Sequence, residues 1–252
     1  MLITKYFLFA LLLINSITFC QEEFPNRKTI FMIGNSTMAD KPYKNGNPEK
    51  GWGQIFPLYF KEEIKIENHA VNGRSTKSFI DEGRWTVVLE KIMEGDYVII
   101  EFGHNDAKKD DPKRFADVNT DYRNNLMKFV NETRSKDAIP VLATPIVRRR
   151  FNDNGEFYDV HGDYPKVVRE VAADMNVFLL DLHKRTEEML IKFGKERSKV
   201  LFLHIEPMEY ESLPNGKTDD THLSAFGAFR VCDLAAKEIQ NLIPDLALFL
   251  KD

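Results

Sequence analysis

Five short apolar runs recur along the chain, and their pattern of hydrophobic positions is typical of buried β-strands. The runs lie at residues 29–33, 64–68, 97–102, 139–143 and 177–181. The run at residues 64–68 alternates apolar with polar positions, whereas the others are nearly continuous. Continuous apolar runs are typical of strands that are covered on both faces, as in a parallel sheet.

Between these runs, apolar residues recur at the spacing of one helical face. The spacing predicts helices around residues 85–92, 122–130 and 167–175, and a last helix over residues 224–242 that Pro244 ends. Strands that alternate with helices predict an α/β fold, a sandwich around a central parallel sheet of about five strands. Right-handed crossovers then gather the carboxyl ends of the strands at one edge, where ligands bind.

Two long stretches, residues 144–163 and 203–221, show no regular periodicity. Both follow an apolar run, so we expect them near the binding edge, and irregular stretches of this length in a compact domain are usually functional. The sequence contains no internal repeat and no linker rich in Gly, Pro or Ser. We therefore predict one domain over residues 21–252.

The first 20 residues differ from the rest of the chain. Lys5 precedes an apolar stretch at residues 6–14, and polar residues follow at 21–23. This pattern predicts a secretory signal peptide over residues 1–20 and hence a secreted or periplasmic protein. An uncleaved anchor is the alternative, although the apolar run is short for one. Acylation of Cys20 in a lipoprotein is disfavoured by the bulky Phe19 before it.

Composition narrows the function classes. The 252 residues are 43% hydrophobic and 29% charged, which is ordinary for a globular protein, and the net charge of -4 offers no basic surface for nucleic acid. Without residues 1–20, Cys232 is the only cysteine, so an intramolecular disulfide is impossible and a buried thiol is expected. The cysteine and histidine spacings do not indicate a zinc site, so we expect no metal. We also expect no cofactor and, after removal of the signal peptide, no membrane association. The oligomeric state stays open.

Four polar clusters occupy the positions where chemistry is expected. Three follow the first three strand-like runs, and the fourth precedes the last helix. They are residues 34–37, 68–75, 103–106 and 219–222. In a parallel sheet the first three gather at one edge, and a long loop can bring the fourth to it.

These clusters contain the parts needed for acyl transfer. A serine hydroxyl such as Ser36 needs an adjacent base, which His222 can supply, and Asp219 can fix the tautomer of that imidazole. The N–H groups of Ser36 and Gly73 and the side-chain amide of Asn105 can stabilise an oxyanion. Each part alone has an ordinary explanation as a turn, cap or surface residue. Their order and spacing together favour catalysis.

The clusters resemble the blocks of the SGNH, or GDSL-type, hydrolase superfamily. The matching blocks are Gly34-Asn35-Ser36, Gly73, Gly103-His104-Asn105-Asp106 and Asp219-Asp220-Thr221-His222. Further motifs resemble the rhamnogalacturonan acetylesterase branch: residues 34–39, Gly51-Trp52-Gly53, residues 72–75, Thr144-Pro145 before Arg148-Arg149, and residues 219–224. The resemblance implies a flavodoxin-like fold with a shallow active site. It also implies a serine esterase that removes acetyl groups from acetylated plant cell-wall polysaccharide of the pectic kind.

By this resemblance, Ser36 is the nucleophile, His222 the base and Asp219 its partner, while Ser36, Gly73 and Asn105 supply the oxyanion donors. One departure is Asn35, because the superfamily usually has aspartate there. Asparagine keeps the size and an acceptor oxygen but loses the charge. Our hypothesis is that the turn survives and activity persists.

Arginines and aromatic residues near the expected edge are candidates for substrate contact. Arg74, Arg148 and Arg149 can grip uronic-acid carboxylates, and Trp52 can offer a flat face to a sugar ring. The alternatives are solvated loop charges and packing beneath the loops. We expect Asp106 to brace its loop. His69, His104, His161 and His204 have no assigned role beyond the loop or the packing.

Other functions stay open at this point. A lipase or thioesterase of the same superfamily would need a long apolar groove, whereas the arginine-rich stretch after Thr144 favours a polar substrate. A xylan acetylesterase is a further alternative. The last is a carbohydrate-binding relative without catalysis, for which Asn35 would be the warning sign.

Overall fold

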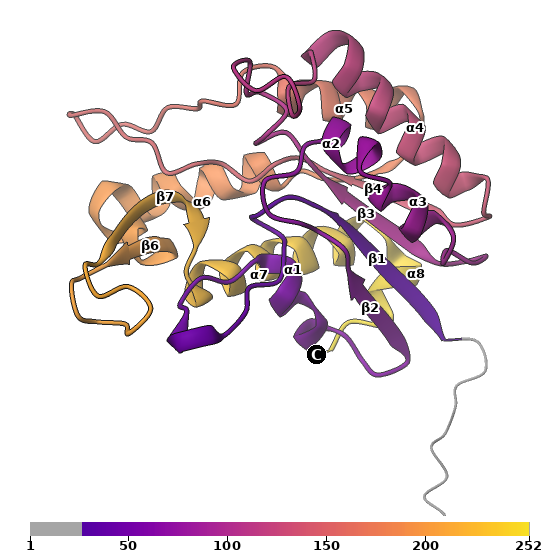
Figure 1. Cartoon of the computed structure of the whole chain (residues 1–252). Coiled ribbons are helices and arrows are strands. Elements are labelled where there is room, and N and C mark those ends of the chain that lie inside the picture. Colours follow the sequence, from indigo (N-terminus) through magenta and orange to yellow (C-terminus); the bar gives the residue numbers. More distant parts are fainter. Residues whose placement is uncertain (1–26, 252) are drawn as a thin grey trace, which may run out of the picture.

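The computed structural model describes residues 27–251 and contains a five-stranded parallel sheet (Figure 1). The strands are β1 (Lys28–Gly34), β2 (Ile64–Asn68), β3 (Tyr97–Glu101), β4 (Ile139–Ala143) and β5 (Phe178–Leu180), in the order β2-β1-β3-β4-β5. All five strand predictions are confirmed. The order is that of the flavodoxin-like doubly wound sheets.

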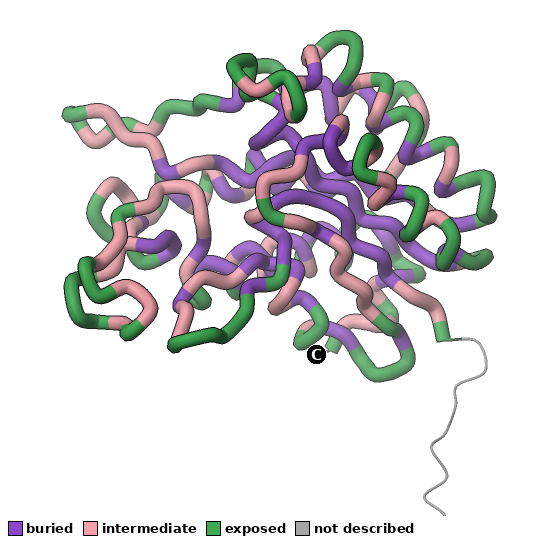
Figure 2. The backbone as a smooth tube through the Cα atoms, viewed as in Figure 1, coloured by how far each residue is buried: buried purple, intermediate pink, exposed green. Residues whose placement is uncertain are grey.

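Helices cover both faces of the sheet, because both faces are apolar. Phe31 and Ile33 of β1 point to one face, and Ile30 and Met32 to the other. The first face packs against α2 (Thr76–Asp81), α3 (Arg84–Leu89), α4 (Arg123–Arg134) and α5 (Tyr164–Asp174). The second packs against α1 (Trp52–Ile55), α6 (Leu182–Arg197), α7 (Ala225–Leu242) and α8 (Pro244–Ala247). The predicted three-layer sandwich is confirmed, and Figure 2 shows the buried strands between the two helical layers.

The helix predictions are confirmed at α3, α4, α5 and α7, but α6 was missed. Leu182, Met189, Leu190 and Phe193 recur there at helical spacing, so the signal was present in the sequence. Short helical turns complete the connections. They are 3₁₀ turns at Lys44–Gly46, Phe56–Tyr59 and Ser198–Leu201, and a π turn at Val118–Tyr122.

The two long stretches differ in structure. Residues 144–163 are irregular apart from one bridge between Phe151 and Phe157, as expected. The stretch at 203–221 is not wholly irregular, which corrects the sequence interpretation. Its ends form an antiparallel hairpin of β6 (Phe202–Ile205) and β7 (Lys217–Leu223), on the left in Figure 1. The Arg149 N–H donates to the Asp220 carbonyl at 2.8 Å and joins the two stretches.

Further predictions from the sequence concern the signal peptide and Cys232. The predicted signal peptide, residues 1–20, lies outside the described residues. Within residues 27–251, the helices are too short or too polar to span a bilayer. Cys232 is a buried free thiol, as predicted, and its Sγ donates to the Trp52 carbonyl at 3.1 Å.

Candidate functional site

A tight turn after β1 presents Ser36 at the carboxyl edge of the sheet. The N–H groups of Met38 and Ala39 donate to the Asn35 carbonyl at 3.2 and 3.0 Å, so the turn forms with asparagine in place. Gly34 is required by close packing, because a Cβ there would lie 2.7 Å from the Glu101 carbonyl oxygen of β3. The strand therefore ends against its neighbour, and the chain turns outward at the serine.

Behind the turn, Asn35 belongs to a buried hydrogen-bond chain. Its Oδ1 accepts from the N–H and the Oγ1 of Thr37 at 3.1 and 3.0 Å, while its Nδ2 is buried without a partner among the described residues. Thr37 Oγ1 also lies 3.0 Å from Glu101 Oε1. A hydroxyl has one hydrogen and can donate to only one of these two oxygens. A proton on Glu101 resolves the conflict, because Glu101 then donates to Thr37 and Thr37 donates to Asn35.

The environment of Glu101 agrees with that protonation. The side chain is fully buried, and burial raises its pKa to about 7, although hydrogen bonds from Trp52 and Thr37 act in the opposite direction. Trp52 Nε1 donates to Glu101 Oε2 at 2.6 Å, and the indole itself is 0% exposed. This corrects the expectation that Trp52 meets substrate: its ring is packed inside the fold and supports the carboxyl group.

The loops after β2 and β3 lie beside the Ser36 turn, because β1 pairs with both strands. Gly73 has a φ of +77°, a conformation that favours glycine, and the Val71 N–H donates to the Gly34 carbonyl at 3.1 Å. Asn105 Nδ2 donates to the Arg74 carbonyl at 3.0 Å, which leaves its second N–H for another acceptor. The structure thus brings Ser36, Gly73 and Asn105 to three adjacent strand ends.

Asp106 braces these loops, as its sequence position suggested. Its Oδ1 accepts from the N–H and Oγ1 of Thr76 at 2.8 and 2.6 Å, and its Oδ2 accepts from the Gly103 N–H at 3.0 Å. The side chain is fully buried, and burial raises its pKa to about 6. Asp106 therefore fixes the loop that carries Asn105.

Asp219 and His222 both lie on β7, where an irregularity brings them to the same side. Phe202 pairs with Leu223 but Leu203 pairs with Asp219, so residues 220–222 bulge out of the hairpin. Asp219 Oδ1 closes the bulge by accepting from the N–H groups of Thr221 and His222 at 2.8 and 3.0 Å. Without the bulge, two residues three apart on a strand would point to opposite faces.

The bulge completes a serine, histidine and aspartate constellation. His222 Nε2 lies 2.9 Å from Ser36 Oγ, and His222 Nδ1 lies 2.8 Å from Asp219 Oδ2. Burial acts to raise the pKa of Asp219, but hydrogen bonds from the His222 ring and N–H outweigh it and hold that pKa well below its usual range. The three side chains are partly exposed, so a substrate can reach them. The arrangement has the geometry of nucleophilic acyl transfer.

Lys217 was missed by sequence reasoning. Its Nζ lies 3.1 Å from Asp219 Oδ2, on the same oxygen that faces His222. Lysine at residue 217 comes two positions before Asp219 in the strand, so its side chain leans to the same face. The signal was this spacing, which becomes readable only once residue 219 is placed in a strand.

The predicted arginine contacts occupy different surroundings. Arg149 is 6% exposed, and its guanidinium contacts Asp220 Oδ1 at 2.8 Å and Ser198 Oγ at 3.1 Å, so it secures the hairpin and does not face a substrate. This corrects the sequence interpretation. Arg74 is shared between Glu82 at 3.0 Å and the Asn72 carbonyl at 2.9 Å. Arg148 donates to the His104 carbonyl at 3.3 Å and forms no ion pair within residues 27–251.

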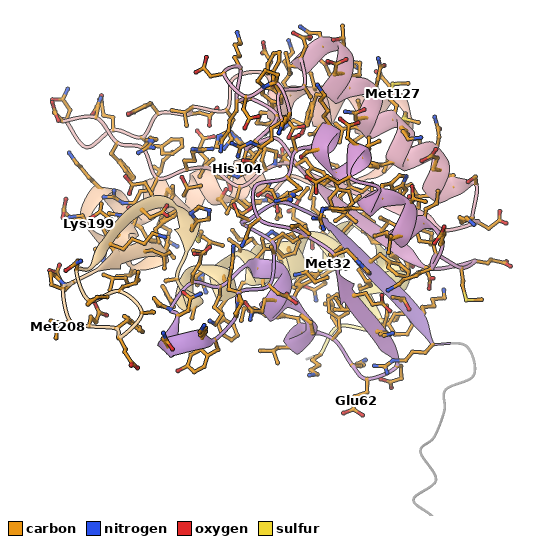
Figure 3. All side chains as sticks on the ribbon, viewed as in Figure 1. Met32, Glu62, His104, Met127, Lys199 and Met208 are labelled. Carbon is orange, nitrogen blue, oxygen red and sulfur yellow. The ribbon has the colours of Figure 1, made fainter. Side chains whose placement is uncertain are left out.

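Histidines without an assigned role form a second cluster. The ring of His161 lies 4.9 Å from that of His104 and 5.3 Å from that of His183, and Asp159 Oδ1 contacts His161 and His183. Figure 3 labels His104 among nitrogen-bearing side chains near the strand ends. Asp159, His161 and His183 are the described residues whose donor set fits a metal ion. The Asp-x-His spacing was visible, but His183 joins it only through the fold.

Comparison with known proteins gives a family and close relatives. The model of the GDSL-like lipase/acylhydrolase family matches residues 32–228. The rhamnogalacturonan acetylesterase RhgT of Bacillus subtilis is 38% identical over 88% of this chain and 92% of its own length. The probable rhamnogalacturonan acetylesterase YesY of the same organism is 32% identical over 84% of this chain and 93% of its own.

Solved structures share the fold at lower identity. The B. subtilis protein YxiM superposes with a TM-score of 0.73 at 23% identity, over 86% of this chain but only 57% of YxiM. A catalytic mutant of the acetylxylan esterase Axe2 from Geobacillus stearothermophilus gives 0.59 at 17% identity, over 84% of this chain and 94% of Axe2. These likenesses establish the architecture of the SGNH hydrolases for the described chain.

Proposed function

Because the chain belongs to the GDSL-like lipase/acylhydrolase family and is a carboxylic ester hydrolase, we propose that it removes acetyl groups from pectic rhamnogalacturonan. The observation that carries the proposal is the 2.9 Å contact between Ser36 Oγ and His222 Nε2, backed by Asp219. The names of the two relatives supply the substrate class. A substrate of this kind is extracellular, and we include export through the predicted signal peptide in the proposal.

The proposed reaction has two halves. Ser36 Oγ attacks the acetyl carbonyl while His222 takes the serine proton, and Asp219 stabilises the resulting imidazolium. The ester bond to the sugar oxygen breaks, and that oxygen receives the proton. Water then attacks the acetyl-Ser36 ester with His222 again as base, releasing acetate and restoring the serine. The oxyanion of each intermediate accepts from the N–H groups of Ser36 and Gly73 and the amide of Asn105.

Donor availability supports this assignment of the oxyanion hole. Within residues 27–251, neither the Ser36 nor the Gly73 N–H donates to a protein acceptor, and Asn105 has one N–H left. Removing a single donor of this kind costs about a hundredfold or more in kcat.

The charge near the site supports an anionic polysaccharide. Burial and the neighbouring Arg150 lower the pKa of Arg148, whereas Asp219 acts to raise it. A half-buried guanidinium without an ion pair among the described residues is stabilised when a carboxylate binds, and the uronic acid of pectic chains carries one. We therefore keep Arg148, together with Arg74, as the proposed substrate contacts.

The function is tested by measuring acetate release from acetylated rhamnogalacturonan and acetylated xylan. We expect release from rhamnogalacturonan to dominate and to fall by at least about a thousandfold in Ser36→Ala. Equal release by native protein and Ser36→Ala would contradict the nucleophile. No release from any ester would favour the carbohydrate-binding alternative, and preference for xylan would move the substrate to that polymer.

The preferred length of the acyl chain distinguishes an acetylesterase from the lipase or thioesterase alternative. A series of nitrophenyl esters from acetyl to octanoyl should show kcat/KM falling as the chain lengthens, because the arginines after Thr144 favour a polar substrate over a long apolar chain. A preference for hexanoyl or longer chains would overturn the acetyl assignment while leaving Ser36 as nucleophile.

Arg148 is tested by substrate charge. We expect Arg148→Gln to raise KM for acetylated rhamnogalacturonan about tenfold, the equivalent of one charge-assisted hydrogen bond, with little change for acetylated xylan. The matched control is Arg150→Gln, because Arg150 is already paired with Asp220 at 3.2 Å. Equal effects on the charged and the neutral polymer would mean that Arg148 acts on structure alone.

A further inference from the structure

We propose that Asp159, His161 and His183 bind a divalent transition-metal ion of the zinc type, which fastens the 144–163 loop to α6. Asp159 and His161 lie near the end of that loop, and His183 lies in the first turn of α6. Asp159 Oδ1 is 2.7 Å from His161 Nδ1 and 3.0 Å from His183 Nε2. One ligand atom from each residue lies within 4.8 Å of the other two.

The ring positions fit a shared ion. With Zn–N bonds near 2.0–2.1 Å, two imidazoles on one tetrahedral ion have ring centres roughly 5 Å apart. The observed separation of His161 and His183 is 5.3 Å, with the ring planes at 89°. The ligand atoms need to spread by only a few tenths of an ångström from their present hydrogen-bond distances. Both imidazoles are buried, whereas Asp159 is exposed, which leaves a path for the ion and room for water as a further ligand.

A second, independent observation comes from unpartnered nitrogens beside the three ligands. His161 Nε2 and both ring nitrogens of His104 are buried without a hydrogen-bond partner in residues 27–251. When an ion takes His161 Nδ1, the proton of that neutral ring moves to Nε2, and metal-bound histidines donate this second N–H to a neighbour. His104 packs edge-on against that ring, with ring centres 4.9 Å apart and planes at 88°, and no hydrogen bond joins the two rings in the present geometry. Nε2 of His161 is therefore not committed to another partner within residues 27–251, so it can carry the proton when an ion takes Nδ1.

The donor set selects the ion. Two imidazoles and one carboxylate suit zinc and neighbouring first-row divalent ions, whereas calcium and magnesium prefer oxygen ligands alone. The site is separate from the serine, histidine and aspartate constellation, so the ion performs no step of ester hydrolysis. The bound ion would affect the proposed catalytic site through His104. Residue 104 directly precedes Asn105, and its carbonyl accepts from Arg148.

The test is zinc binding to the full-length protein after treatment with a chelator. Calorimetry should show one ion per chain with roughly micromolar or tighter affinity, and the melting temperature should rise when zinc is added. We expect His183→Gln and Asp159→Asn to weaken binding by more than about a hundredfold, since loss of outer partners alone costs 10–100-fold. Asp159→Asn keeps an oxygen acceptor for both imidazoles, so it separates loss of the ion from loss of the fold.

The matched control is His69→Gln, because His69 contacts a single carboxylate, Glu67 Oε2 at 3.0 Å, and lies outside the cluster. It should bind zinc like the native protein. Cobalt supplies a second readout, because its visible absorption changes when imidazoles replace water, and this change should be absent in Asp159→Asn. The proposal is overturned if the native protein binds neither ion, or if native and Asp159→Asn proteins bind zinc equally, which would place the ion elsewhere. None of these readouts depends on esterase activity.

Discussion

The two regions that meet at Ser36 shift the pKa values of their acids in opposite directions. On the sheet edge, Glu101 and Asp106 are fully buried beside neutral donors, and burial raises their pKa values to about 7 and about 6. On the hairpin and the long loop, Asp219 and Asp159 accept from imidazoles, which hold their pKa values well below the usual range. Burial at the edge shifts both acids toward the protonated form, whereas the hydrogen bonds from imidazoles in the outer region favour the charged form.

The difference follows from what each region has to do. The edge must hold the turn of Ser36 rigidly, and a neutral chain from Glu101 through Thr37 to Asn35 does this without an unpaired buried charge. The outer region must stabilise a positive imidazolium during the proposed reaction, and an ionised Asp219 supplies that. The division also explains how asparagine can stand at residue 35: the edge already has one acid in the chain.

The largest expected effect is at the outer region. Asp219→Asn should lower kcat about ten-thousandfold, because the new amide donates to His222 Nδ1 and forces the proton onto Nε2, which can then no longer accept from Ser36. The measurement is acetate release at saturating substrate. Asp220→Asn is the matched control, one residue along the same strand, where the carboxylate serves Arg149 and His204. A loss of the same size in both variants would mean that the hairpin, not the tautomer, is damaged.

The second-largest expected effect is on the pH dependence of the free energy of unfolding, to which Glu101 and Asp219 contribute with opposite signs. Glu101 is protonated more readily folded than unfolded, so its contribution to the free energy of unfolding is full below its unfolded pKa near 4.5 and is lost as pH rises to about 7. The loss amounts to about 3 kcal/mol at most. Asp219, whose pKa is lowered, acts in the opposite sense, and its contribution is lost as pH falls.

Glu101→Gln should remove the part of the pH dependence of the free energy of unfolding that comes from Glu101. Glutamine can accept from Trp52 and donate to Thr37, as the protonated acid does. Urea unfolding of native and variant proteins at pH 5 and pH 8 should show the native protein losing its advantage at the higher pH. Glu132→Gln is the control, because Glu132 accepts from the indole of Trp85 at 2.6 Å but lies at the surface. A native advantage that is constant with pH would contradict a protonated Glu101.

The sheet edge was readable from the sequence, and the outer region was not. Apolar runs locate strands, and residues just after them must gather at one edge, so the clusters that contain Ser36, Gly73 and Asn105 were placed there from pattern alone, whereas their roles were assigned from the order of the motifs and the family resemblance. In the β6–β7 hairpin, β6 is short and β7 is polar and carries a bulge, so no regular apolar periodicity indicates the hairpin. Asp219 and His222 were found from their short motif, not from the strand that holds them.

The burial of side chains by residues that are distant in the sequence could not be predicted either. Trp52 was expected to meet sugar but is enclosed by Glu101, and Arg149 was expected to meet substrate but is held by Asp220, 71 positions further on. A side chain's exposure depends on which remote residues reach it, and one sequence does not specify that. The histidine cluster was missed for the same reason, since His183 comes from a helix that the sequence analysis did not predict.

The smallest expected effect tests Asn35 itself. In Asn35→Asp, the new carboxylate accepts the same two bonds from Thr37, and Glu101 can retain the proton of the chain, so we expect turnover to change by less than about tenfold. Asn35→Ala, which removes the acceptor, should lose more activity than the aspartate variant. A gain on the order of a hundredfold in kcat for Asn35→Asp would mean that the usual carboxylate does something the neutral chain does not. The sheet edge would then require an ionised carboxylate, as the hairpin does at Asp219, and the proposed difference between the two regions would be wrong.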